Sequence, residues 1–196
     1  EFYYYWGIAH YQKEEKEEAL EVFKKGVQQV TPESDKAMVS DFYSIMGDLY
    51  HLKKMNAEAY AAYDSALVYK DDNIGALNNY AYYLSLEKKD LDKAEEMSYR
   101  TVKAEPNNGT YLDTYAWILF TKQKYTEAKL YIERVVEGDI DNDEEVSGGV
   151  LEHAGDIYAK CGEMDKAVEF WRKARDKGGD VSTVLEQNLE ASTAIE

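Results

Sequence analysis

The stretch LEHAGDIYAKCGEMDKAVEFWRKA, residues 151–174, decides the fold of this chain. It holds two small residues, Gly155 and Ala167, on either side of a polar turn. The alanine recurs at intervals of 40, 35, 34 and 39 residues, as Ala19, Ala59, Ala94, Ala128 and Ala167. Another small residue precedes each alanine at a nearly fixed distance, namely Gly7, Gly47, Ala81, Ala116 and Gly155. Self-similarity at such a period indicates an array of repeated units.

Each repeat is predicted to be a pair of amphipathic helices, because apolar residues recur three and four positions apart on both sides of a polar turn. The predicted repeats are about 1–31, 36–71, 74–106, 109–138 and 144–178. In the last four repeats the predicted helix pairs are about 36–52 with 55–69, 74–87 with 91–104, 109–121 with 125–137, and 144–160 with 164–176. A short helix at about 182–192, with Val184, Leu185 and Leu189 on one side, is predicted to cap the last repeat.

The small residues have a steric explanation. Two helices joined by a short turn lie close together only where a residue at their crossing has almost no side chain. The third repeat departs from this pattern, because Ser98 and Thr101 stand where the other repeats have apolar residues or glycine. It also carries one extra residue near Lys89 and Asp90, which predicts a longer turn.

These residues resemble the tetratricopeptide repeat (TPR) family, whose unit of about 34 residues has preferred residues at seven places. In the last repeat the matching residues are Leu151, Ala154, Gly155, Tyr158, Ala167, Trp171 and Ala174. The resemblance implies an all-α fold, a right-handed superhelical solenoid of five TPR helix–turn–helix units plus a C-terminal capping helix. It also implies one array over residues 1–196, as the C-terminal part of a longer bacterial TPR-repeat protein. Bacterial cytoplasm and cell envelope both stay open as compartments.

The charge restricts the class of partner. The chain has 23 Lys and Arg against 39 Asp and Glu, a net charge of −16. A domain this acidic repels nucleic acid and anionic membrane surfaces, and attracts basic peptides or basic protein faces. No apolar run approaches the length of a membrane span. The alternative interpretation is that the acidic surface serves only solubility.

The resemblance also predicts a peptide-binding groove, lined by the first helix of each repeat. The residues at its inner positions are acidic, aromatic or polar, and the groove would grip an extended or helical peptide with basic and apolar side chains. The predicted groove residues are Tyr4, Tyr5, Tyr11, Asp41, Asp48, His51, Asn78, Asn79, Tyr82, Asp113, Trp117, Phe120, Glu152, His153 and Asp156. The alternative is that the tyrosines pack between helices and the acids are merely solvated.

Catalysis is not expected, and the chain is predicted to be a scaffold or adaptor without a cofactor or bound metal. Glu152, His153 and Asp156 lie within one helical turn, so an enzyme or small-ligand function at this patch is an alternative, but no nucleophile or phosphate loop accompanies them. The acidic run 139–143 resembles the start of a calcium loop. Glu144 and Val150 stand where glycine and a bidentate acid are needed, so we predict an ordinary acidic loop.

The start of the chain offers a second surface. The aromatic residues Phe2, Tyr3, Tyr4, Tyr5 and Trp6 are consecutive, and one helix cannot turn all of them inward. Further repeats upstream or a second copy of the chain would cover them. An alternative function is therefore that of a self-assembly module, in which copies of the chain join through Phe2, Tyr3, Tyr4 and Trp6.

Overall fold

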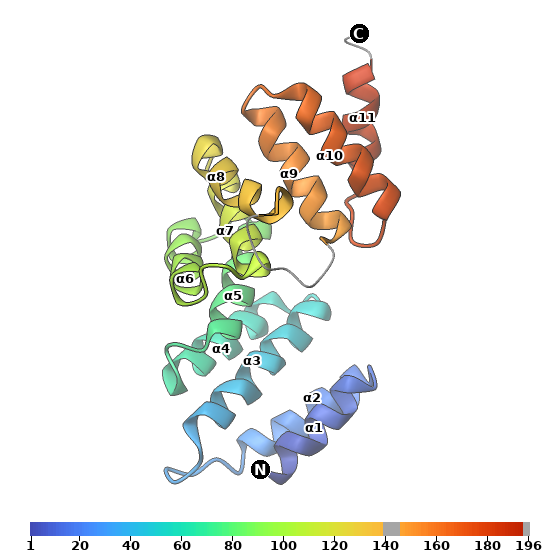
Figure 1. Ribbon diagram of the computed structural model, residues 1–196. Coiled ribbons are helices and arrows are strands. Elements are labelled where there is room, and N and C mark those ends of the chain that lie inside the picture. Colours follow the sequence, from blue (N-terminus) through green and yellow to red (C-terminus); the bar gives the residue numbers. More distant parts are fainter. Residues whose placement is uncertain (139–145, 194–196) are drawn as a thin grey trace. The chain divides into compact units, whose positions relative to one another are not determined.

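The computed structural model describes residues 1–138 and 146–193, and all regular elements in this part are α-helices (Figure 1). They are α1 (Phe2–Gln12), α2 (Lys16–Val27), α3 (Lys36–Leu52), α4 (Asn56–Tyr69), α5 (Ile74–Leu86), α6 (Leu91–Ala104), α7 (Gly109–Thr121), α8 (Tyr125–Val136), α9 (Gly148–Lys160), α10 (Met164–Lys177) and α11 (Leu185–Thr193). The predicted all-α fold is confirmed, and most predicted helix ends are correct to within one residue.

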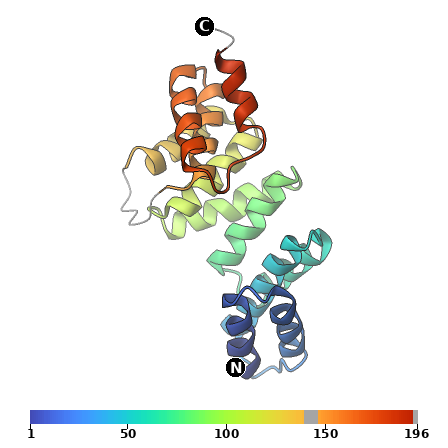
Figure 2. The ribbon, with the colours of Figure 1, turned by 90° about the vertical axis from the view of Figure 1, so that its right-hand side faces the viewer.

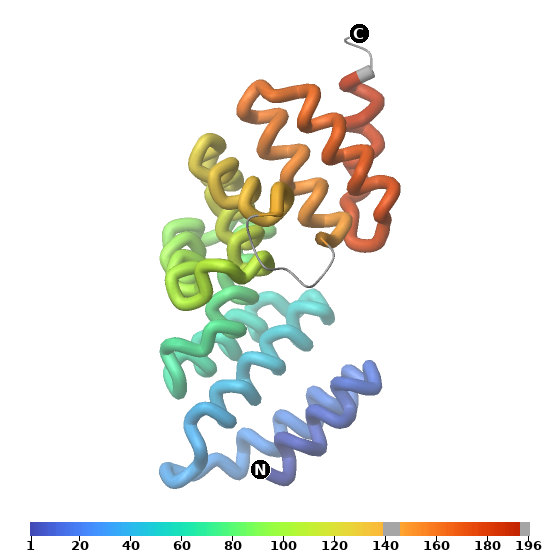
Figure 3. The backbone as a smooth tube through the Cα atoms, viewed as in Figure 1, coloured from blue at the N-terminus to red at the C-terminus, as the bar shows by residue number. Residues whose placement is uncertain are grey.

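The chain forms two compact units, the N-terminal unit Glu1–Tyr83 and the C-terminal unit Leu84–Glu196. In the N-terminal unit α1 packs against α2, and α3 against α4. In the C-terminal unit α7 packs against α8, α9 against α10, and α11 against the outer side of that last pair (Figures 1 and 2). The tube in Figure 3 shows these pairs as antiparallel hairpins with tight turns. Continuity of the five repeats as one array stays a prediction.

The turn inside each repeat has the same backbone geometry. A residue with positive φ lies in every one of these turns: Glu14 (60°), Lys54 (59°), Lys88 (53°), Gln123 (62°) and Gly162 (81°). In the third repeat Asp90 adds a second such residue, with φ 42°, which accommodates the predicted extra residue. A left-handed conformation costs a non-glycine residue about 1 kcal/mol. Packing of the two helices therefore imposes the turn on four sequences that do not favour it.

The small residues lie where an aromatic ring of the second helix crosses the first. A Cβ atom added to Gly7 would lie 2.5 Å from Phe23, one on Gly47 would lie 2.7 Å from Tyr63, and one on Gly155 would lie 2.3 Å from Trp171. No side-chain carbon fits at such distances. In the fourth repeat the same two positions hold Ala116 and Ile132, both fully buried. The larger first residue is thus matched by a smaller second one.

Two helix starts differ from the prediction. The predicted start of α9 at 144 lies outside the described residues, and the helix begins at Gly148 with Ser147 as its N-cap. The Ser147 hydroxyl donates to Asp180 (3.1 Å), and the backbone N–H of Gly149 donates to the same carboxylate (2.8 Å). Asp180, which lies 33 residues after Ser147 and 31 after Gly149, thus adds a tertiary contact to the Ser147 cap of α9.

The capping helix α11 begins at Leu185, not at 182, because Ser182 is bound to Glu152 of α9. Leu185 and Leu189 are buried as predicted, but Val184 precedes the helix and is 48% exposed. The prediction that Val184 shares the apolar side of the cap is therefore wrong. No helix in the described part of the chain has the length and apolar character needed to cross a membrane.

The contact between Gly7 and Phe23 generates a stability prediction. We expect Gly7→Ala to lower the free energy of unfolding by about 1–3 kcal/mol, because the added methyl group meets a fully buried ring. Adding Phe23→Ile should recover much of this loss, since the pair then matches Ala116 and Ile132. Chemical denaturation of the single and double variants measures the coupling.

A matched control for this cycle is Gly75→Ala in α5. Gly75 is exposed, and an added Cβ would meet only Asn73 Oδ1, at 3.6 Å. The control should be neutral or stabilising, by at most about 1 kcal/mol. Strictly additive effects of Gly7→Ala and Phe23→Ile would show that the two positions are not matched in size.

Candidate functional site

The predicted groove residues divide between the two compact units. In the N-terminal unit, Tyr4, Tyr5 and Tyr11 lie on α1, Asp41, Asp48 and His51 on α3, and Asn78, Asn79 and Tyr82 on α5. In the C-terminal unit, Asp113, Trp117 and Phe120 lie on α7, and Glu152, His153 and Asp156 on α9. Each set forms its own network within its unit.

Asp48 is the centre of the first network. Its carboxylate accepts hydrogen bonds from the Tyr63 hydroxyl and from Asn79 Nδ2, the latter at 3.0 Å. Asn79 in turn accepts from Asn78 Nδ2 at 3.2 Å. Burial raises the pKa of Asp48 above its usual value, although the hydrogen bonds from Tyr63 and Asn79 act in the opposite direction. The donors are uncharged, so the negative charge of Asp48 has no counter-charge in this network.

Asp41 lies two helical turns before Asp48 and also binds uncharged donors. Asn73 Nδ2 donates to Asp41 at 3.0 Å, and the Tyr4 side chain lies near the same carboxylate, so that burial together with this carboxylate raises the pKa of Tyr4. The Asn73 side chain also contacts Ser40 and caps α5 by accepting from the backbone N–H of Ala76 (3.1 Å). Asp41 is therefore held in place by neutral groups on α1 and at the start of α5.

Aromatic rings surround these acids. The His51 imidazole stacks on Tyr83, with ring centroids 3.5 Å apart, and Tyr82 lies next to Tyr83 at 5.9 Å. Tyr5 is 65% exposed and contacts Tyr4 edge to face. In the N-terminal unit, Tyr4 therefore lies near Asp41, and Tyr11 and Tyr83 lie near Asp48. That the predicted residues form one binding surface stays a prediction.

The second network joins α7 to α9. His153 Nδ1 lies 2.9 Å from Asp113 Oδ1, and its ring stacks on Trp117 at 4.1 Å. Trp117 stacks in turn on Phe120 at 4.8 Å. Burial alone would lower the pKa of His153, but the Asp113 carboxylate, with Asp156 and Glu152 nearby, outweighs burial and raises it above 6.5. The Asp113 carboxylate therefore favours the protonated form of His153.

Glu152 and Asp156 bind residues of the C-terminal segment that includes α11. Glu152 is 5% exposed and accepts from both the backbone N–H of Ser182 (2.6 Å) and the Ser182 hydroxyl. Asp156 accepts from the Trp171 indole N–H (2.9 Å) and from Asn188 (3.3 Å). These contacts occupy two members of the predicted acid–base patch with intramolecular partners. Within the described ranges, no group of three or more His, Cys, Asp or Glu side chains is placed to hold a metal ion.

Comparisons with known proteins decide the fold. No family model matches the sequence, and no curated protein matches it significantly. Among solved structures, YrrB, described as a TPR protein with an unusual peptide-binding site, matches with a TM-score of 0.69 at 22% identity, over 97% of this chain and 90% of its own. MamA from Desulfovibrio magneticus RS-1 matches with a TM-score of 0.70 at 16% identity, over 89% and 92%. TTC0263 from Thermus thermophilus, described as a thermophilic TPR protein, matches with 0.66 at 10% identity, over 98% and 97%.

The chain has the tetratricopeptide repeat fold. The structural matches establish the TPR fold. Because the sequences are only 10–22% identical, the matches say nothing more specific about function. The helices of the described residues correspond to about five TPR units and a capping helix.

Sequence analysis missed the hydrogen bonds between the TPR aromatic position and the groove acids. Tyr63 donates to Asp48 and Trp171 donates to Asp156, in each case across fifteen residues. Both acids directly follow the glycine on which the ring packs. In the first repeat Gly7 is followed by Ile8, and its partner Phe23 has no polar group. In this TPR sequence, a Gly-Asp pair followed by Tyr or Trp fifteen residues after the aspartate therefore indicates a hydrogen bond from the ring to the aspartate.

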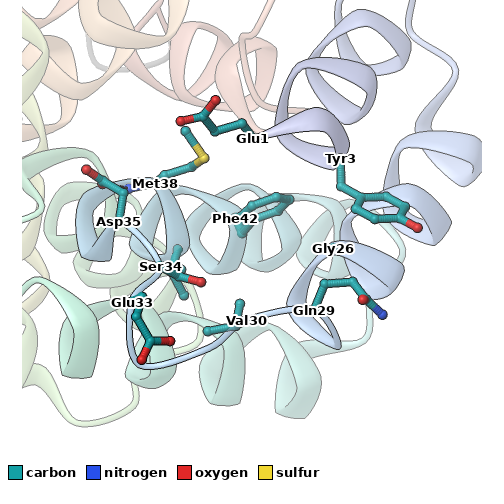
Figure 4. Close-up of a pocket in the computed structure, with 11 residues that line it drawn as sticks. Glu1, Tyr3, Gly26, Gln29, Val30, Glu33, Ser34, Asp35, Met38 and Phe42 are labelled. Carbon is teal, nitrogen blue, oxygen red and sulfur yellow. Dashed lines mark hydrogen bonds between the residues drawn. The ribbon is translucent and has the colours of Figure 1, made fainter.

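A second missed feature is a pocket of about 220 Å³ at the start of the N-terminal unit (Figure 4). Figure 4 shows Phe42 at its centre, with Met38 and Glu1 on one side and Tyr3 on the other. Its lining residues are Glu1, Tyr3, Gly26, Gln29, Val30, Glu33, Ser34, Asp35, Met38, Val39 and Phe42. The pocket combines an apolar floor with acidic side chains, and Tyr3 is the residue that it shares with the predicted self-association surface.

The raised pKa of Asp48 generates a pH-dependent prediction. We expect Asp48→Asn to raise the melting temperature at neutral pH, because the amide oxygen can accept the same hydrogen bonds without a buried charge. The gain should be absent below about pH 3.9, the value for aspartate in an unfolded chain. It should grow as the pH rises toward the higher pKa of the folded state, and stay constant above it.

Thermal unfolding of both proteins over this pH range is the measurement. Glu58→Gln, at an exposed position on α4, is the control for loss of one negative charge from the whole domain. A destabilised Asp48→Asn variant at neutral pH would show that the charge of Asp48 is compensated in the folded protein.

Proposed function

We propose that this chain is a non-catalytic protein- or peptide-binding scaffold or adaptor, and that it binds an extended or helical segment with basic and apolar side chains. The observation that carries the proposal is the environment of Asp41 and Asp48. Among the described residues, both carboxylates accept hydrogen bonds from uncharged groups only, so each keeps a net negative charge beside aromatic rings. A lysine or arginine of a partner would supply the counter-charge that the fold leaves out.

The binding surface proposed for the N-terminal unit follows α1, α3 and α5. Its acids provide charge, and Tyr4, Tyr5, Tyr11 and Tyr82 provide rings that can contact apolar groups or the faces of cations. Asp41 and Asp48 are seven residues apart on α3, which places them about 10 Å apart along the helix. Two basic side chains of one segment would therefore bind two helical turns apart.

In the C-terminal unit, the Trp117 and Phe120 rings support an apolar contact for the same kind of segment. The Trp117 ring also stacks on the His153 ring, and a hydrogen bond to Asp113 holds His153 in place. Rings fixed in this way lose little conformational entropy on binding. Glu152 and Asp156 are left out of this proposal, because Ser182, Trp171 and Asn188 occupy them.

The same occupancy argues against the enzyme or small-ligand alternative at Glu152, His153 and Asp156. An acid–base group must reach a substrate atom, whereas Glu152 is buried and bound at both oxygens. The likeness to YrrB supports peptide binding as a use of this fold, and the residues of this chain support the basic character of the peptide.

A pair of peptides tests the proposal. One carries alternating Lys/Arg and Leu, and the other replaces each basic residue with Glu. We expect calorimetry to show binding of the basic peptide that weakens with salt, and none of the acidic one. Asp41→Asn and Asp48→Asn should each weaken binding by about two- to fivefold, which is typical of losing one partly exposed ion pair.

The control variant is again Glu58→Gln, which removes one negative charge from α4, outside the proposed binding surface. Asp48→Asn is informative because stability should rise while affinity falls, so misfolding cannot explain the loss. Equal affinity for both peptides, or a basic preference unchanged in both aspartate variants, would contradict the proposed surface.

Self-assembly through the start of the chain is a second candidate, supported by the exposure of Trp6. The equivalent positions in later repeats are buried: Met46 (6%), Tyr80 (4%), Tyr115 (7%) and Ala154 (0%). Trp6 is instead 41% exposed and Phe2 is 70% exposed, with the two rings in contact at 5.5 Å. An apolar cluster of this kind is stabilised when another helix covers it.

Sedimentation over a range of concentrations tests this candidate. The chain should associate as its concentration rises, and Phe2→Ser with Trp6→Ser should shift it to monomer. Val68→Ser on α4 removes a side chain that is 82% exposed outside the cluster, and should change nothing. A chain that stays monomeric at all concentrations would rule out self-assembly through this surface.

A further inference from the structure

We propose that one oxygen of Asp48, Oδ2, takes either a cationic side chain of the partner or a proton, so that acidification releases the partner from the N-terminal unit. The inference rests on the binding of a basic segment proposed above, and it adds control of that binding by pH. The geometry of the Asp48 carboxylate carries the inference, because its two oxygens have different surroundings.

Both hydrogen bonds to Asp48 end on the same oxygen. The Tyr63 hydroxyl and Asn79 Nδ2 each donate to Oδ1, the latter at 3.0 Å. Oδ2 accepts no hydrogen bond from the described residues, and the buried, unpartnered side-chain atoms of this part of the chain do not include it. An oxygen that is neither hydrogen-bonded nor buried is open to solvent. Oδ2 is therefore the oxygen that a ligand can reach.

The two donors restrict the rotation of the carboxylate. The Tyr63 side chain is fully buried, and its ring packs so closely on Gly47 that an added Cβ would lie 2.7 Å from it. Asn79 is held in turn by Asn78, whose Nδ2 donates to it at 3.2 Å. A carboxylate that is anchored through one oxygen loses little conformational entropy when the other oxygen binds a cation. Tyr63 is thus a positioning residue for the proposed contact.

A proton and a cationic side chain compete because each neutralises the same charge. Burial raises the pKa of Asp48 while Tyr63 and Asn79 act to lower it, and no lysine or arginine among the described residues contributes. Asp48 therefore takes up its proton at a higher pH than an aspartate in an unfolded chain, for which the pKa is about 3.9. A bound cation favours the charged form, so the pKa is lower in the complex than in the free protein. Between these two pKa values the affinity falls as the pH falls.

Other titratable groups also surround Asp48. Tyr11 on α1, Tyr63 on α4 and Tyr83 on α5 lie close to it. Burial, and then the charge of Asp48, raises the pKa of all three, so they stay uncharged at neutral pH and below. The helix α2, which also packs on α3, adds no charge that shifts the pKa of Asp48. His51 on α3 stacks on Tyr83, and it would repel a cation once protonated, which for histidine ordinarily happens near about pH 6.5.

Carboxyl-carbon NMR of the whole chain tests the competition directly. The Asp48 signal is assigned by comparison with Asp48→Asn, and is followed from about pH 8 to about pH 4 with and without a saturating amount of the basic peptide. We expect the peptide to lower the pKa of Asp48 by about 0.3–0.7, which corresponds to the two- to fivefold loss of affinity expected for Asp48→Asn. The exposed Glu58 on α4 is the internal control, and its titration should not depend on the peptide.

Calorimetry over the same pH range measures the release. The affinity of the wild type for the basic peptide should fall about two- to fivefold more on acidification than that of Asp48→Asn. Tyr63→Phe keeps the ring on Gly47 but removes a hydrogen bond that favours the charged form, so it should move this fall to a higher pH. Tyr99→Phe, at a half-exposed tyrosine of the C-terminal unit, is the matched control and should leave the fall in place. His51→Gln should also retain it.

The outcomes separate this inference from the proposed function. If the basic peptide does not bind at neutral pH, both are wrong. If it binds at neutral pH but the Asp48 signal titrates at the same pH with and without it, the binding surface stands and the competition at Oδ2 is wrong. A fall in affinity that persists in Asp48→Asn and disappears in His51→Gln would assign the pH dependence to His51, and would overturn the inference as well.

Discussion

The close approach of two helices over a glycine or an alanine is the constraint on which each repeat depends. The ring of Phe23, Tyr63 or Trp171 occupies the space where a methyl group would otherwise stand. A glycine inside a helix costs about 1 kcal/mol in helix propensity, so the contact must return more than that in packing. The adjoining turns have a residue with positive φ in all five repeats, including the two that have alanine in place of the glycine.

This packing also places the acids of the candidate site. An aspartate that directly follows the glycine lies beside the edge of the packed ring. Tyr63 and Trp171 carry their donor groups at that edge, and each donates to such an aspartate. The core contact and the position of the acid are therefore one structural unit. In the fourth repeat Ala116 and Ile132 leave no polar edge, and the next residue is Trp117, which stacks on His153 instead.

The sequence predicted what depends on local periodicity and steric size. Helix ends, the repeat period and the extra residue near Asp90 follow from spacings of three and four and from small residues at the crossing. The start of α9 is not set by this periodicity, because Ser147 caps the helix by accepting from the backbone N–H of Val150, and Asp180 binds Ser147 and Gly149. Likewise, the groove pattern placed Glu152 and Asp156 correctly on α9. It could not reveal that Ser182 and Asn188 occupy them, since those contacts arise only when α11 packs on the last repeat.

The difference between Asp48 and Asp156 is the basis of the binding role that we propose for Asp48. Burial raises the pKa of both residues, and an aromatic donor holds both. Asp156 is also bound by Asn188 of the cap and lies near His153, whose raised pKa favours a positive charge. Asp156 thus has intramolecular partners in addition to its aromatic donor. Among the described residues Asp48 has only the neutral donors Tyr63 and Asn79, so its charge is a net cost to folding at neutral pH. An asparagine would fill the same place at lower cost if packing were the whole role of the position. A charge that folding opposes is most simply explained by a partner that supplies the opposite one.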